Sequence, residues 1–214
     1  MIASADDIER ALSGHALDAA PRLLGAVLRR ESPEGTVGIL LTEVEAYRGG
    51  MDPGTHAFRG MTPRTAPMFA EAGRLYAYFT YGMHTCLNIV VGREGEAEAC
   101  LLRAGRVVEG ADLARSRRAA ARSATAKPLR DVELARGPAS LVRALGAELA
   151  DSGRRVDEAP FSLELPDDRA AGELAPHVRT LRVGVTGEGG KAPFDWRFHV
   201  EGEPTVSRFV PGRR

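Results

Sequence analysis

Strand-forming and turn-forming residues alternate along much of the chain in the pattern of antiparallel β-hairpins. Residues 23–47 are dominated by strand formers and are interrupted once, by a turn at 32–35. Residues 74–91 contain two further β-rich runs around the turn at 81–83. Side chains repeat on one face of a strand at every second residue, so Glu43 and Glu45 are expected to face the same way.

Three more runs of strand formers follow in the second half of the chain. AEACLLRAG predicts a strand that ends near Arg103, and TLRVGVT and DWRFHV predict the last two strands. The loop at 48–73 is rich in Gly, Pro and Thr and has no period, and loops of this length in compact domains are usually functional or disordered. Residues 148–176 are acidic and contain proline, which predicts a surface excursion.

Start and stop signals predict four helices. Ser4 is a suitable N-cap with acidic residues after it, and its helix should run to about residue 14. Further helices are expected near 18–21 and after 109, and from Gly137-Pro138 to the C-cap Gly146. We therefore expect a mixed α/β (α+β) fold with a curved, largely antiparallel sheet, peripheral helices and a protruding hairpin. No repeat or linker divides the chain, which predicts one domain over residues 1–214.

Composition narrows the class of protein. Hydrophobic residues make up 43% and charged residues 27%, as in soluble globular proteins. No apolar run is as long as a membrane span, and the first residues lack the layout of a secretory signal, so we expect a cytoplasmic protein without a membrane partner. Cys86 and Cys100 stand outside any CxxC arrangement and are expected to be buried free thiols.

Charge is distributed unevenly although the formal net charge is zero. Residues 101–147 contain ten Arg or Lys against four Asp or Glu, and residues 148–174 contain three against eight. This polarity predicts one basic face for a polyanion. Only Lys127 and Lys191 are lysines, so the positive charge is almost entirely guanidinium, which suits phosphate contacts. The same scarcity of amines argues against Schiff-base chemistry and favours water as a nucleophile.

All four tyrosines lie between residues 47 and 81, close in sequence to Glu45, His56 and Asn88. Aromatic rings beside a carboxylate and hydrogen-bonding groups suit a planar heteroaromatic guest. Tyrosines also favour strands and pack cores, and the residues alone do not separate the two interpretations.

The order of the motifs is more specific. TEVEAY is followed by His56, by the triplet Thr62-Pro63-Arg64, by LYAYFTYGMHTCLN, by LLR, and finally by RVGV and WRF. This series resembles the alkyladenine (3-methyladenine) DNA glycosylase family from about residue 23 to residue 208. The resemblance implies a monofunctional enzyme of base excision repair without AP-lyase activity. Such an enzyme flips 3-methyladenine, 7-methylguanine, hypoxanthine or ethenoadenine from duplex DNA and leaves an abasic site.

The resemblance also implies roles for residues near the reaction. Glu45 matches the general base that activates water, and Arg103 and the main chain of Val183 match the groups that help to hold this water. A nearby guanidinium favours an ionised carboxylate, which is the form that accepts a proton. Glu43, on the same strand face, is the alternative base.

Further matches concern the base and the DNA. Tyr47 is expected to stack on one face of the flipped base, His56 and Tyr78 on the other, and Asn88 to crowd the purine 2-position and disfavour guanine. Tyr81 matches the residue that intercalates into the duplex. Residues next to it in the turn, and residues of the TPR triplet, are expected to contact DNA. The remaining predicted DNA contacts are Met83, His84, Arg64, Thr62 and the arginines between 115 and 130.

Other kinds of site have weaker support. The five histidines lack the spacing of a metal motif, and no phosphate-binding glycine motif is present, so we expect no metal and no cofactor. The expected partner is double-stranded DNA containing damaged purines, bound by a monomer that associates with the nucleoid. Two alternatives stay open: a protein of this fold that binds distorted DNA without cleaving it, and a formyltransferase-like domain, which would give Tyr81 no role.

Overall fold

The computed structural model describes residues 2–80, 82, 84–123, 125–166 and 176–212. Within these ranges nine strands form one sheet, and every pairing among them is antiparallel. The strands are β1 (Val27–Ser32), β2 (Gly35–Arg48), β3 (Leu75–Thr80), β4 (His84–Val90), β5 (Glu98–Glu109), β6 (Ala135–Arg136), β7 (Phe161–Glu164), β8 (His177–Thr180) and β9 (Arg197–Val200). The mixed α/β fold with a largely antiparallel sheet is thus confirmed.

The sheet is built around its two longest strands, β2 and β5. Its main path runs in the order β3-β4-β5-β2-β1-β7, and β9 adds to β2 and carries β8 on its other side. Register shifts interrupt the pairing of β2 with β5 on both sides of Glu43. Such irregularities re-aim side chains locally, and here they lie within two residues of Glu45.

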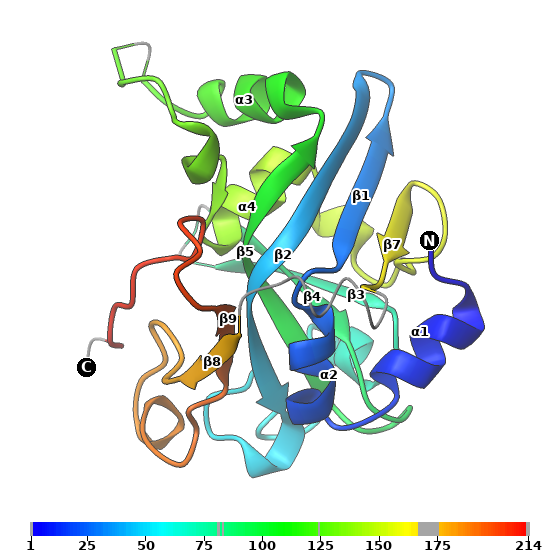
Figure 1. The fold of residues 1–214 in the computed structure, drawn as a ribbon. Helices are drawn as coiled ribbons and strands as arrows, with labels where there is room; N and C mark the ends of the chain where they lie inside the picture. Colours follow the sequence, from blue (N-terminus) through cyan, green and yellow to red (C-terminus); the bar gives the residue numbers. More distant parts are fainter. Residues whose placement is uncertain (1, 81, 83, 124, 167–175, 213–214) are drawn as a thin grey trace.

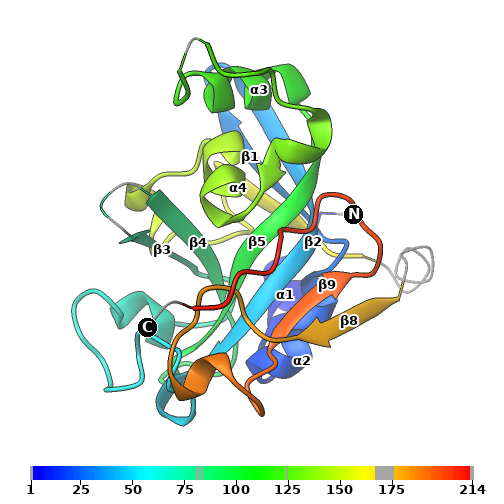
Figure 2. The same cartoon turned by 90° about the vertical axis from the view of Figure 1, so that its left-hand side faces the viewer.

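In the described part of the chain, four α-helices cover the sheet in two pairs, α1 (Ala5–Leu12) with α2 (Ala16–Leu23) and α3 (Ala111–Ala119) with α4 (Pro138–Leu145). Figures 1 and 2 show α3 and α4 at one end of the molecule and α1 and α2 towards the other. Short 3-10 turns connect other elements: η1 (Gly49–Met51), η2 (Ala66–Phe69), η3 (Asp131–Glu133), η4 (Leu149–Asp151) and η5 (Glu188–Gly190). No helix in the described ranges has the length and apolar character needed to cross a bilayer.

Local signals placed the helices well. Ser4 and Asp7 form the reciprocal bonds of a capping box, and Gly146 closes α4 in the left-handed conformation, at φ 78°. The second helix begins at Ala16, slightly before its expected start. Cys86 and Cys100 are buried free thiols, as expected.

Two expectations for the second half of the chain were wrong. Within 148–176, Phe161–Glu164 forms β7, which pairs with β1 and buries Phe161 and Leu163 in the core. TLRVGVT is not one strand, because β8 ends at Thr180 and the chain then turns. The physical reason is tertiary: the Arg182 side chain turns inward to Asp52, and the backbone at Val183 turns towards Glu45.

The second predicted hairpin is present as β3 and β4, which pair from Leu75 with Ile89 to Thr80 with His84. Tyr81 and Met83, in the turn, lie outside the described residues. The protrusion of this hairpin therefore stays a prediction.

Candidate functional site

A cavity of about 300 Å³ opens between the central strands and two loops, a size at the lower end for small-molecule sites. One loop follows β2 and the other follows β8. Most of the residues singled out for base recognition and catalysis line this cavity, namely Tyr47, His56, Tyr78, Asn88, Arg103 and Val183. The fold therefore brings together residues that are up to 136 positions apart, as counted from Tyr47 to Val183.

Glu45 lies directly behind this lining and is fully buried. Its Oε1 accepts the backbone N–H of Val183 at 2.7 Å, and its Oε2 accepts the Tyr47 hydroxyl at 2.9 Å. The Arg103 Nε is 3.4 Å from the same Oε1. A carboxylate has about four lone-pair positions, so Glu45 keeps capacity to accept a further hydrogen bond.

Glu43 is bound quite differently. Its Oε1 accepts the Nε groups of Arg103 at 2.8 Å and of Arg197 at 2.7 Å, and also the Ser207 hydroxyl at 2.8 Å. Its Oε2 accepts the Ser207 N–H at 2.7 Å. Burial opposes ionisation of this carboxyl, but the two guanidinium groups and the Ser207 amide outweigh burial and lower its pKa. Glu43 is thus a saturated counter-ion, which makes it the weaker candidate for a base.

Arg103 connects the two carboxylates. Burial opposes its charge, but Glu45 and Glu43 together raise its pKa. Its shorter contact is with Glu43, at 2.8 Å against 3.4 Å for Glu45. The guanidinium therefore supplies positive charge near Glu45 without occupying that carboxylate closely.

Aromatic side chains form much of the cavity wall. The His56 and Tyr78 rings meet edge to face with centroids 4.5 Å apart, and Tyr76 stacks on Tyr78 at 5.4 Å. Burial and the positive charge of Arg64 lower the pKa of His56, so its imidazole is neutral at neutral pH. Burial and the charge of Glu45 raise the pKa of Tyr47, which keeps its hydroxyl protonated as a donor.

Asn88 is held in one orientation at the cavity wall. Its side-chain Nδ2 donates to the Tyr76 carbonyl at 2.9 Å, and the residue is 4% exposed. An amide fixed in this way can act as a steric barrier to a guest, because it cannot swing aside without losing a buried hydrogen bond.

Several residues of the site were missed from the sequence. Arg197 and Ser207 bind Glu43, and Arg182 forms a buried ion pair with Asp52. Arg182 and Arg197 lie within the RVGV and WRF motifs, so these motifs could have indicated both residues. Asp52 and Ser207 have no local signature, because their importance comes from partners more than 100 residues away.

Three of the other predicted DNA contacts, Arg64, Thr62 and His84, are described by the structure, and none of them lines the cavity. Arg64 is exposed, with its guanidinium carbon 5.7 Å from the Tyr78 ring centroid. Thr62 is also exposed and bonds to Thr65, which orders this loop. His84 opens β4, at the opposite end of the turn from Thr80, which lines the cavity.

A second, larger hollow of about 820 Å³ lies on the other side of α4. Pro138 of α4 lines the first cavity, whereas Ala139 and Arg143 line the second together with His84. Near it are three half-buried arginines, Arg118, Arg122 and Arg143, and no described acidic residue pairs with any of them.

These three arginines lie close enough to affect one another's charge. Partial burial and the charges of Arg143 and Arg122 lower the pKa of Arg118. The Arg118 Nε is buried and has no hydrogen-bond partner in the part of the chain that the structure describes. Guanidinium groups without a described acidic partner suit an anion from outside the chain.

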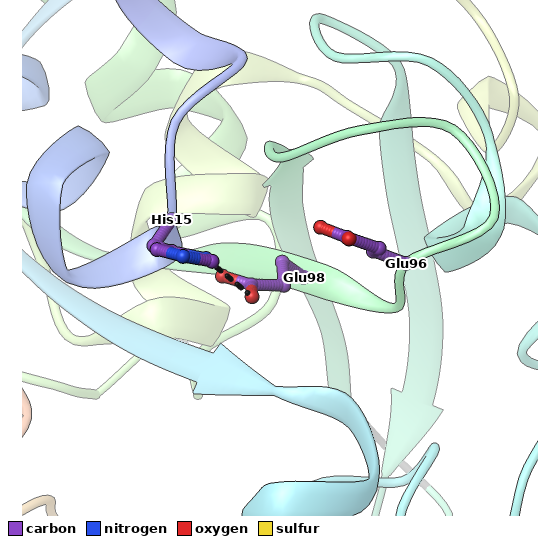
Figure 3. Close-up of side chains that lie close together, drawn as sticks. All are labelled: His15, Glu96 and Glu98. Carbon is purple, nitrogen blue, oxygen red and sulfur yellow. Dashed lines mark hydrogen bonds and ion pairs between the residues drawn. The ribbon is translucent and has the colours of Figure 1, made fainter.

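A third cluster has the composition of a metal site but a different explanation. His15, Glu96 and Glu98 have candidate ligand atoms within 4.8 Å of one another, and Figure 3 shows His15 bonded to Glu98. Arg48, however, donates from Nε to Glu98 at 3.1 Å and lies 2.8 Å from His15 Nδ1. Its positive charge already neutralises the groups that a cation would bind, so we interpret the cluster as a set of polar contacts that joins α2 to the sheet.

Comparison with known proteins gives a consistent result. The sequence pattern of the family described as methylpurine-DNA glycosylase (MPG) matches residues 10–204. A protein of Leifsonia xyli subsp. xyli is 55% identical over 194 residues, which cover 90% of this chain and 87% of that protein.

Two further relatives are similar over comparable lengths. The Streptomyces avermitilis protein is 46% identical over 209 residues, covering 92% of this chain and 90% of its own, and the Nocardia farcinica protein is 45% identical over 198 residues, covering 89% and 85%. All three carry the name "Putative 3-methyladenine DNA glycosylase". The chain belongs to the methylpurine-DNA glycosylase family.

Proposed function

We propose that the protein is a monofunctional DNA glycosylase that excises alkylated or deaminated purines from duplex DNA by using water activated by Glu45. The observation that carries this proposal is the state of Glu45. This carboxylate is buried, fixed by Val183 and Tyr47, next to Arg103, and still able to accept a further hydrogen bond behind a cavity lined with aromatic rings.

In the proposed reaction the bond between the sugar C1′ and the purine nitrogen breaks, and its electron pair leaves with the base. Water forms the new bond to C1′ and gives its proton to Glu45. The negative charge of the carboxylate also stabilises the oxocarbenium-like transition state. N-methylated purines carry a positive charge and leave neutral, whereas hypoxanthine or ethenoadenine also needs a proton on the leaving base.

Arg103 and Val183 would assist this water in different ways. The Val183 N–H already donates to Glu45, so Val183 could hold the water only through its carbonyl oxygen. Arg103 is mainly bound to Glu43 and contributes positive charge near the attacking oxygen. Tyr47, with His56 and Tyr78, would stack on the flipped base, and Asn88 would reject the amino group of guanine.

Water is favoured over an amine nucleophile by where the lysines lie. Neither Lys127 nor Lys191 lines the cavity, and Lys191 is paired with Glu188 at 2.9 Å. A Schiff base with the sugar would need an amine within reach of C1′. This distribution supports the proposal that the enzyme lacks AP-lyase activity.

The test uses duplex oligonucleotides that each contain one hypoxanthine or ethenoadenine, and methylated DNA, incubated with the protein and a chelator. Hot alkali then reveals abasic sites. Strand breaks that appear only after alkali support a metal-independent monofunctional glycosylase. Breaks without alkali would contradict the lack of lyase activity, and no breaks on any substrate would favour damage binding without excision.

The turn residue Tyr81 provides the next prediction. Tyr81→Ala should weaken capture of a lesion about tenfold to a hundredfold, because stacking contributes roughly 1–3 kcal/mol per base. It should leave the midpoint of thermal unfolding nearly unchanged. Affinity is measured for a hypoxanthine duplex in a Glu45→Gln background, where no turnover is expected. Phe58→Ala removes an exposed ring, 45% accessible, from another loop and serves as the control. Equal affinities of the Glu45→Gln protein with and without Tyr81→Ala or Phe58→Ala would contradict the intercalating role of Tyr81.

The unpaired arginines provide a prediction about salt. Arg118→Gln or Arg122→Gln should each reduce the slope of log affinity against log salt by about 1, because each loss removes one phosphate contact. The effect should be the same for damaged and undamaged duplexes. Arg93→Gln is the matched control, since Arg93 is exposed, has no described acidic partner and lies at a different hollow. A slope unchanged in Arg118→Gln and Arg122→Gln, or changed equally in Arg93→Gln, would exclude this phosphate contact.

A further inference from the structure

Among the described residues, Arg182 has the largest side chain that is almost completely buried, with 1% exposure. Its Nη1 donates to Asp52 Oδ2 at 2.6 Å and to the Ala46 carbonyl at 3.0 Å. Its Nη2 donates to Asp52 Oδ1 at 2.7 Å and to the Gly189 carbonyl at 2.8 Å. A buried charge is costly unless it is paired and hydrogen-bonded. This guanidinium is bonded to three separate segments through Nη1 and Nη2, while its buried Nε has no partner among the described residues.

The surrounding chain makes room for this guanidinium. A Cβ on Gly54 would lie 2.5 Å from the Arg182 Nη2, and one on Gly189 would lie 2.5 Å from the Gly54 nitrogen. Both distances are shorter than real Cβ contacts, so only glycine fits at these positions. The loop at 52–54, which borders the cavity through Pro53 and Gly54, is thus packed around Arg182.

Arg182 lies behind the ring that we propose as a stacking surface. Its guanidinium carbon is 4.5 Å from the Tyr47 ring centroid and 5.3 Å from that of Trp196. Tyr47 lines the cavity, and Arg182 does not. The guanidinium therefore supports the Tyr47 ring from the protein side.

The same residue also fixes the chain next to Glu45. Val183 directly follows Arg182, and its N–H makes the 2.7 Å bond to Glu45 Oε1. Gly184 then turns the chain at φ 74°, and its N–H donates to the Val210 carbonyl at 2.9 Å. Anchoring Arg182 therefore sets the Tyr47 ring and the Val183 amide relative to each other.

We propose that Arg182, held by Asp52, is a positioning residue that keeps the stacking ring of Tyr47 and the carboxylate of Glu45 in the relative positions that excision requires. This inference rests on the proposed function, because it assumes those two roles. Lysine cannot replace arginine here, since a single ammonium cannot span Asp52, Ala46 and Gly189 in one plane. Small displacements of reacting groups can cost about a hundredfold in rate.

The experiment compares Arg182→Lys and Asp52→Asn with wild type on a hypoxanthine duplex. Single-turnover excision at saturating enzyme should fall about 10- to 100-fold, and affinity for the lesion should fall with it. The concentration of active sites is measured separately for each protein, and rates are divided by it. A variant with a smaller folded fraction is then not mistaken for a slower enzyme. If Arg182→Lys does not fold, Asp52→Asn carries the comparison, because it retains the guanidinium and one oxygen acceptor.

Asp157→Asn is the matched control. Asp157 has a side chain that is only 6% exposed and holds Arg155 through two bonds of 2.9 and 3.0 Å, in a segment that does not line the cavity. Its loss should lower stability and leave the rate per active site and the lesion affinity unchanged. Trp196 is the only tryptophan of the chain, so its fluorescence should change in Arg182→Lys and not in Asp157→Asn.

The possible outcomes separate the inference from the function on which it rests. Wild-type rate and affinity per active site in both Arg182→Lys and Asp52→Asn, with only stability lowered, would overturn the positioning role. Excision that is lost in Glu45→Gln but normal in these two variants would do the same and leave the proposed function intact. Absence of excision by the wild type would overturn both proposals.

Discussion

Glu45→Gln is expected to reduce the single-turnover rate of excision by about 10³- to 10⁴-fold, because it removes both the proton acceptor and the negative charge next to C1′. Lesion binding should persist. Glutamine has the same shape, and its oxygen can still accept the Val183 N–H that now bonds to Glu45 at 2.7 Å. Arg103 would retain Glu43 as its counter-ion at 2.8 Å, so the variant should fold.

The measurement pairs two readouts on one duplex with a single hypoxanthine. Abasic sites are counted over time with enzyme in excess, and affinity is followed by fluorescence anisotropy. Loss of excision with affinity within about threefold of wild type would support the role of Glu45. Retained excision would exclude Glu45 as the base, and loss of binding as well as excision would indicate that the side chain mainly holds the cavity together.

Much of the fold could be predicted from sequence because its signals are local. Alternation of strand formers located the hairpins, and the capping residues Ser4 and Gly146 placed two helix ends within about two residues. The TLRVGVT prediction failed for a non-local reason. Its strand-like composition was outweighed by the Arg182–Asp52 pair and the Val183–Glu45 bond, which join residues more than 100 positions apart.

The candidate site shows the same contrast between features that the sequence predicts and features that depend on long-range contacts. The resemblance identified Tyr47, His56, Tyr78, Asn88 and Arg103, and the structure places all of them around one cavity. The resemblance assigned the base to Glu45, and the strand pattern left Glu43 as the alternative. Both carboxylates face Arg103, and the structure distinguishes them by the other groups that bind each one. That difference depends on Arg197 and Ser207, which reach Glu43 from the far end of the chain.

Glu43→Gln is expected to lower the free energy of unfolding by about 3–5 kcal/mol, the usual cost of removing one partner from a buried ion pair. Arg103 and Arg197 would lose the negative charge that they share, and their side chains are only 7% and 4% exposed. Urea unfolding at pH 7 measures the loss. Asp7→Asn is the control, because it removes an exposed carboxylate that also bonds locally, and its effect should be much smaller.

The effect of Glu43→Gln should also depend on pH in one direction. Because the native state lowers the pKa of Glu43 below its ordinary value of 4.5, the unfolded chain binds the proton more readily, and stability from this group is present above that value. As pH falls below about 4.5 this contribution is lost, so the curves of wild type and Glu43→Gln should converge. A constant difference from pH 7 to pH 3 would contradict the ionised state of Glu43. A fully stable Glu43→Gln without excision would return this residue to consideration as the base.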